Sequence, residues 1–158
     1  GVQRGGDRAS KTLALHRHIY AAAGASARCA IHTHSTHLVA LTLQGVWSGD
    51  DIVPPITPYF VMKVGHVPLV PYALPGDARA AEAAAERIAR FAARGTPIRA
   101  VMLERLGPVV WHASPAAASA VLEELEETAR LWLAGGRALT PLTEPQIEAL
   151  RQAFGAAW

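Results

Sequence analysis

One short segment constrains the fold most. In it, an apolar sequence typical of a strand is followed by a histidine-rich turn and then by a sequence typical of a helix. Residues 28–32 are apolar and tolerate an extended backbone, so they predict a short buried strand. Residues 35–43 fit a helix better, and Ser35 is placed to cap its first turn. The sequence therefore places His32 and His34 at a strand-to-helix turn.

The spacing of these two histidines has a chemical meaning. Residues two apart on an extended strand point to the same face, so both imidazoles of a His-x-His pair can reach one ion. Imidazole nitrogen is a good ligand for zinc. A histidine-rich turn that binds no ligand is the plainer alternative, and the pair alone does not separate the two.

Composition predicts one globular domain spanning residues 1–158. Apolar residues make up 51% of the chain and charged residues 18%, which is enough to bury a core. The formal net charge of +2 is too small to indicate nucleic acid or a membrane surface as a partner. No run of 18 apolar residues is present, so no membrane span is predicted.

The cysteine content and the first ten residues indicate the cellular compartment of the protein. Cys29 is the single cysteine, so it cannot form a disulfide within the chain, and it fits a reducing compartment. A small buried side chain is its expected role. Residues 1–10 contain no apolar segment of the kind found in a signal peptide. We therefore expect a cytoplasmic protein.

Periodic apolar residues and cap signals predict the remaining elements. Ser10 is a candidate cap for a helix over residues 11–23 that ends at Gly24. Lys11 lies in the first turn of that helix, where a hydroxyl and an ammonium group together favour a bound phosphate; a solvated lysine is the alternative. Further helices are predicted over 78–94, 115–134 and 147–154, and strands over 66–72, 98–103 and 108–111.

Other patterns narrow the class of protein. The sequence contains no Gly-x-Gly-x-x-Gly or Walker motif, which argues against the nucleotide-binding folds that use them, and no Gly-x-Ser-x-Gly elbow. The acidic run over residues 123–127 is predicted to be a solvated helix face.

Several of these segments together carry a resemblance to a known family. They are Ser10-Lys11 and the ranges 31–37, 57–72, 107–110 and 123–129. In this order they resemble the class II aldolase/adducin family, and within it most closely the 3-oxo-tetronate 4-phosphate decarboxylase branch. The family's Gly-Asn phosphate loop has no counterpart here, so we expect the chain to lack the family's N-terminal segment.

The resemblance implies a fold, an assembly and an activity. The implied fold is an α/β, three-layer α/β/α domain with a mostly antiparallel central sheet, assembled as a homo-oligomer, typically a tetramer. The implied activity is that of a metal-dependent carbon–carbon lyase acting on a phosphorylated sugar acid. Its reaction would convert 3-oxo-tetronate 4-phosphate into dihydroxyacetone phosphate and CO2, with the metal polarising the ketone.

The resemblance also assigns site residues. His32 and His34 would bind Zn2+ or another divalent metal, and Ser10 and Lys11 would lie near the substrate phosphate. The sequence departs from the family pattern at two positions. Thr12 occupies the position of an acid/base carboxylate, and Leu106 occupies that of a third histidine ligand.

Two other histidines, His37 and His66, are candidates for an additional metal or substrate contact, whereas His112 lies too far along its strand. Two alternatives to the decarboxylase stay open. One is a degenerate, non-catalytic family member that serves as a binding or assembly subunit. The other is an aldolase or epimerase acting on another sugar phosphate.

Overall fold

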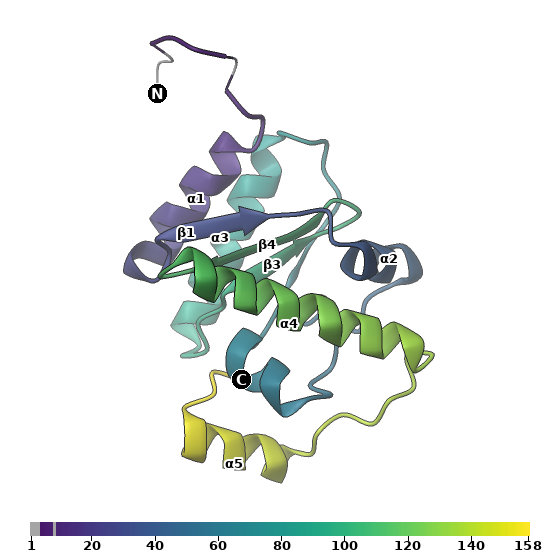
Figure 1. The fold of residues 1–158 in the computed structure, drawn as a ribbon. Helices are drawn as coiled ribbons and strands as arrows, with labels where there is room; N and C mark the ends of the chain where they lie inside the picture. The colour runs from purple at the N-terminus through teal and green to yellow at the C-terminus, as the bar shows by residue number, and fades with distance from the viewer. Residues whose placement is uncertain (1–3, 8) are drawn as a thin grey trace.

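The computed structural model describes residues 4–7 and 9–158, and its centre is a sheet with helices on both faces (Figure 1). The strand order is β1-β4-β3-β2. The pairs β1/β4 and β3/β4 are antiparallel, and β2/β3 is parallel. The strands are β1 (Cys29–His32), β2 (Leu69–Val70), β3 (Ala100–Leu103) and β4 (Gly107–His112).

Helices cover the sheet in two layers, which confirms the predicted three-layer α/β/α arrangement (Figure 1). One layer contains α1 and α3, which pack against each other, and the other contains α4 with α2 against it. A π-helical turn, η2, packs between α4 and α5. The helices are α1 (Leu13–Ala23), α2 (Thr36–Gln44), α3 (Ala78–Ala93), α4 (Pro115–Ala134) and α5 (Glu144–Phe154), with η1 (Gly24–Ser26) and η2 (Phe60–Val64) as short turns.

The core is divided by the sheet. Ile19, Phe91 and Trp111 are buried between the sheet and the α1/α3 layer. Leu38 and Leu125 are buried on the opposite face, under α4. Alternate side chains of a strand point to opposite faces, so the apolar strands β3 and β4 supply both halves of the core. No helix among the described residues is long and apolar enough to cross a bilayer.

The predicted edge strand is much shorter than its sequence suggested. Residues 66–72 were predicted as a strand, and only Leu69–Val70 pairs, at the outer edge next to β3. Pro68 and Pro71 flank this pair, and a proline has no N–H with which to extend a ladder. The prolines therefore fix the edge position that the sequence predicted and limit the strand to two residues.

Two chain segments approach each other closely at Gly107, the first residue of β4. Its φ is +125°, a conformation that side chains disfavour. A Cβ atom built there would lie 1.9 Å from the carbonyl oxygen of Thr33 and 3.1 Å from the Cα of His34. The start of β4 therefore packs backbone against backbone on the His-x-His segment.

Substituting Gly107→Ala is expected to destabilise the protein by roughly 3 kcal/mol or more, because the methyl group meets backbone atoms and the φ is strained. Urea unfolding followed by circular dichroism measures the change. Gly49→Ala is the matched control, since nothing lies within 4 Å of a Cβ at that position. Equal stability of the two variants would contradict the close packing inferred at Gly107.

Candidate functional site

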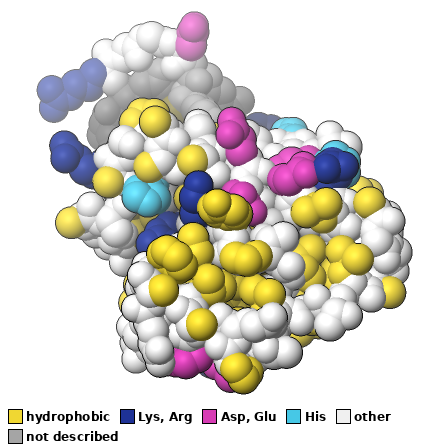
Figure 2. Space-filling view, turned by 60° about the horizontal axis from the view of Figure 1, so that its bottom comes forward, with side chains coloured by type: hydrophobic (Ala, Val, Ile, Leu, Met, Phe, Trp, Pro, Cys, Tyr) yellow, Lys and Arg dark blue, Asp and Glu magenta, His cyan; other side chains and the backbone are white. Residues whose placement is uncertain are grey.

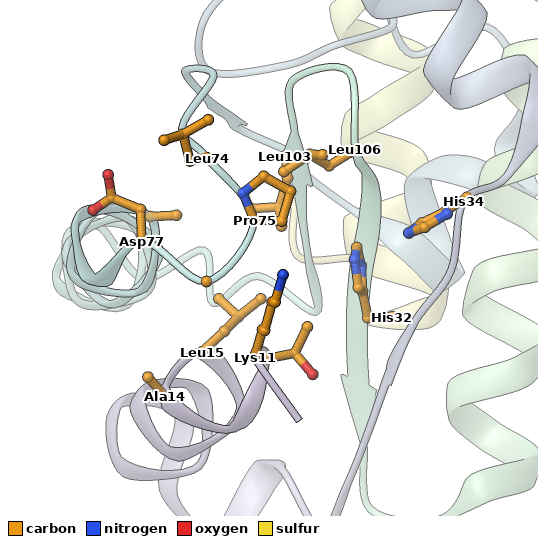
Figure 3. Close-up of a pocket in the computed structure, with 13 residues that line it drawn as sticks. Lys11, Ala14, Leu15, His32, His34, Leu74, Pro75, Asp77, Leu103 and Leu106 are labelled. Carbon is orange, nitrogen blue, oxygen red and sulfur yellow. The ribbon is translucent and has the colours of Figure 1, made fainter. Parts of the chain in front are cut away.

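A cavity of about 170 Å³ lies where the ends of β1 and β3, the start of α1 and the turn before α3 meet (Figure 3). It brings together three of the residues that the sequence marked as functional: Lys11, His32 and His34. Thr12 and Leu106, the two positions at which the sequence departs from the family pattern, line the same cavity. Two of the segments that carried the resemblance, Ser10-Lys11 and residues 31–37, thus contribute side chains to one cavity.

His32 is held with one ring nitrogen turned toward the backbone. Its Nδ1 lies 2.9 Å from the carbonyl oxygen of Pro108, which can only accept, so Nδ1 carries the hydrogen. In the neutral ring, Nε2 is then left with a free lone pair. Burial lowers the pKa of His32, and the nearby His34 and His16 lower it further, while the Pro108 hydrogen bond opposes them. His32 is therefore a neutral imidazole poised to accept a proton or bind an ion.

His34 is the exposed member of the pair. Its ring centroid lies 5.5 Å from that of His32, and the two rings meet edge to face. Both side chains line the same cavity, as the His-x-His spacing predicted. The pair could hold one ion between them only if other groups complete its coordination.

Lys11 and Thr12 come from the start of α1. The helix begins at Leu13 with Thr12 as its N-cap, later than the predicted cap at Ser10. The Ser10 hydroxyl instead accepts a hydrogen bond from the Thr12 N–H at 3.3 Å and lies 2.9 Å from the Thr12 hydroxyl. In Figure 3 the Lys11 side chain extends into the cavity, and Ser10 is not among the residues that line it.

His37 lies outside the cavity and contacts an acidic residue of α4. Its Nδ1 lies 2.8 Å from Oε1 of Glu126, and its backbone N–H donates to the same oxygen at 2.9 Å. The N–H of Leu38 donates to Oε2 at 3.1 Å. Glu126 therefore caps α2, and the predicted Ser35 makes no side-chain cap bond.

This contact corrects the prediction that the acidic run is only a solvated helix face. Glu123 and Glu127 are exposed, as expected, whereas Glu126 reaches across to α2. The interaction joins residues 89 apart in sequence. The helical periodicity of the run gave no signal for it, because partner choice depends on how α4 crosses α2.

His66 also lies apart from the cavity. Its Nδ1 lies 2.9 Å from Oδ1 of the buried Asp51, which accepts a further bond from the Val67 N–H. The ring stacks on Trp158, with centroids 4.3 Å apart. In this position His66 joins the 48–52 loop and the C-terminal residues to the core. The structure therefore places neither His37 nor His66 beside His32 and His34.

The resemblance implies a divalent metal, and such an ion would need ligands from the lining of this cavity. The one carboxylate in the lining, Asp77, caps α3 and is paired with Arg79. It points away from the imidazoles in Figure 3. Among the described residues, no group of three or more His, Cys, Asp or Glu side chains is placed to hold a metal. The residues present therefore do not fit a catalytic metal centre, which normally takes three protein ligands.

The comparisons with known proteins begin with a family model. The model of the class II aldolase and adducin N-terminal domain matches residues 1–133. A 3-oxo-tetronate 4-phosphate decarboxylase of Cupriavidus necator is 54% identical, and the match covers 97% of this chain and 69% of the relative. The Escherichia coli K12 protein of the same name is 41% identical, with 92% of this chain and 66% of the relative covered. The chain thus spans about two thirds of the length of these relatives.

Solved structures agree with the fold. YgbL of Escherichia coli, described as a candidate aldolase/epimerase/decarboxylase, superposes with a TM-score of 0.81 at 38% identity. That match covers 96% of this chain and 70% of the other. An L-fuculose 1-phosphate aldolase has a TM-score of 0.73 at 22% identity, covering 98% of this chain and 68% of the other. The second likeness shows the fold alone.

In metal-free buffer containing EDTA, we expect the His32 imidazole to titrate below the ordinary histidine pKa of about 6.5. Because its folded pKa is lowered, the unfolded chain takes up this proton first as the pH falls. The free energy of unfolding should therefore decline between about pH 6.5 and the lower folded pKa. Two-dimensional NMR of the imidazole resonances measures the midpoint, with His32→Asn for assignment. A midpoint above the ordinary value would contradict the burial assigned to this ring.

Proposed function

The chain belongs to the class II aldolase and adducin family, and on that premise we propose that it acts on a phosphorylated sugar acid. The reaction we propose is decarboxylation of 3-oxo-tetronate 4-phosphate to dihydroxyacetone phosphate and CO2. The relatives named as this decarboxylase support that choice. The observation that carries the proposal is the convergence of Lys11, His32 and His34 on one cavity.

The lining of the cavity suits a small anionic ligand. The Lys11 ammonium group enters from the start of α1, where the positive end of the helix dipole also favours an anion (Figure 3). Leu15, Leu103 and Leu106 form apolar walls that strengthen such a charge interaction. A phosphate at the Lys11 end would leave the carbon chain of the ligand directed toward the imidazoles.

The chemistry needs an electron sink and a proton. When a 3-oxo acid loses CO2, the C1–C2 bond breaks and its electron pair moves onto the oxygen at C3. A proton must then be added at C2. With the phosphate at Lys11, the carbon chain faces the neutral His32, whose Nε2 can take up and return a proton.

A second candidate function is favoured by the same cavity. Thr12 and Leu106 line it at the positions where the family pattern has a carboxylate and a histidine. A hydroxyl with no useful pKa and an aliphatic side chain supply neither proton transfer nor ion binding. A domain that binds the phosphorylated sugar acid without turning it over therefore remains the alternative to the decarboxylase.

Two measurements separate these functions. Coupled detection of dihydroxyacetone phosphate from 3-oxo-tetronate 4-phosphate, in the presence of Zn2+, reports turnover. Calorimetric titration with dihydroxyacetone phosphate reports binding. Turnover lost in His32→Gln supports the decarboxylase, binding without turnover supports the alternative, and neither binding nor turnover contradicts both.

Lys11→Ala is expected to weaken the binding of dihydroxyacetone phosphate by about 10-fold to 100-fold, because a charge-assisted hydrogen bond to phosphate is lost. Isothermal titration calorimetry measures the change. Lys63→Ala is the matched control, because Lys63 is the other lysine of the sequence and lies in η2, over the Tyr59 ring. An equal loss in both variants would show that the phosphate is not held at Lys11.

A further inference from the structure

We propose that Leu106 occupies the position where a third metal ligand would be needed in this cavity, so that the site takes its anionic ligand through Lys11 without a bound metal. Leu106→His should then create a three-histidine metal site. The ligand named here rests on the proposed function, whereas the statement about the metal concerns the residues alone and is tested separately.

The position of Leu106 is fixed by the backbone. Gly107 packs directly on Thr33 and on the Cα of His34, as its missing Cβ shows. The Leu106 N–H donates to the Leu103 carbonyl at 3.1 Å in the turn between β3 and β4. The backbone at position 106 is therefore held next to the His-x-His segment. In agreement, Leu106 lines the cavity together with His32 and His34 (Figure 3).

Leu106 also separates this cavity from a shallow hollow beside it. The hollow is lined by Leu106 and His34 together with Arg105 and residues of α2. Because Leu106 lines both the cavity and the hollow, it forms a wall next to the exposed His34. It contributes an apolar surface at the point where a third ligand would have to approach an ion held by the pair.

Three other histidines are engaged elsewhere. His37 is paired with Glu126, and His66 with Asp51. The Nδ1 of His18 contacts the Ala14 carbonyl at 2.8 Å. None of these three lines the cavity. Replacement of the missing ligand by any of these three would therefore require a rearrangement of existing contacts.

The charge of the cavity lining also favours an anionic ligand over a divalent cation. Lys11 brings a positive charge to the cavity that contains the imidazoles, and the Asp77 carboxylate is already paired with Arg79 at 2.6 Å. A cation gains little in such a place, whereas an anion gains a partner. The geometry is thus better matched to direct binding of a phosphate or carboxylate than to a divalent ion.

The test compares zinc and cobalt binding by four forms of the full chain. They are the natural sequence, Leu106→His, the double variant Leu106→His/Thr12→Glu, and Leu74→His. Leu74→His is the matched control, because Leu74 is 66% exposed, lines the same cavity and lies away from the imidazoles in Figure 3. Calorimetry gives the zinc affinity, and the visible absorption of bound Co2+ reports coordination by histidine, independently of any activity.

The expected result is sub-stoichiometric zinc in the natural sequence at micromolar supply and at least about 100-fold tighter binding in Leu106→His. Leu74→His should resemble the natural sequence, and adding Thr12→Glu should tighten binding further. One zinc per natural chain, lost in His32→Ala/His34→Ala, would overturn the proposal. So would a folded Leu106→His with no gain in affinity. If that variant does not fold, Leu106→Cys makes the same test.

A parallel titration tests the binding of the ligand separately from the binding of the metal. Dihydroxyacetone phosphate is titrated into the natural sequence in EDTA, where we expect binding to persist. Binding that appears only when Zn2+ is added would overturn the metal-free mode. No binding with or without Zn2+ would contradict the proposed ligand, and the zinc affinities of the four forms would still decide the role of Leu106.

Discussion

The site depends on the contact between Gly107 and the backbone of Thr33 and His34. Because no Cβ intervenes, β4 starts directly against the end of β1, and the two antiparallel strands stay in register up to the point where the histidines emerge. The Pro108 carbonyl is thereby brought to the His32 ring, which it orients. One close backbone approach thus sets the position of both imidazoles and of the side chain at 106.

The orientation of His32 suits a metal ligand, whereas the side chains around it do not complete a metal site. His32 has the arrangement usual for a metal ligand, with its second nitrogen bonded to a backbone carbonyl and its pKa lowered by burial. The neighbouring positions that would complete such a site carry a leucine and a threonine. A scaffold can keep a precise geometry while the chemistry of a few side chains changes, since packing and reactivity depend on different atoms.

Sequence reasoning predicted what depends on local pattern. The helices α3 and α4 and the strand before the His-x-His turn follow from periodicity and caps. It did not predict contacts that depend on how elements cross. The Glu126 cap of α2 and the pairing of His66 with Asp51 both result from tertiary packing that no local pattern specifies.

The contact between Glu126 and α2 limits where the protein can bind an anionic group. The helix after the His-x-His turn presents its positive N-terminal end close to the site, and a carboxylate of the protein itself already neutralises that end. A phosphate in the cavity would therefore gain no stabilisation from the N-terminal end of α2. The start of α1, with Lys11 beside it, would receive that phosphate, and an elongated ligand would then lie with its phosphate toward α1.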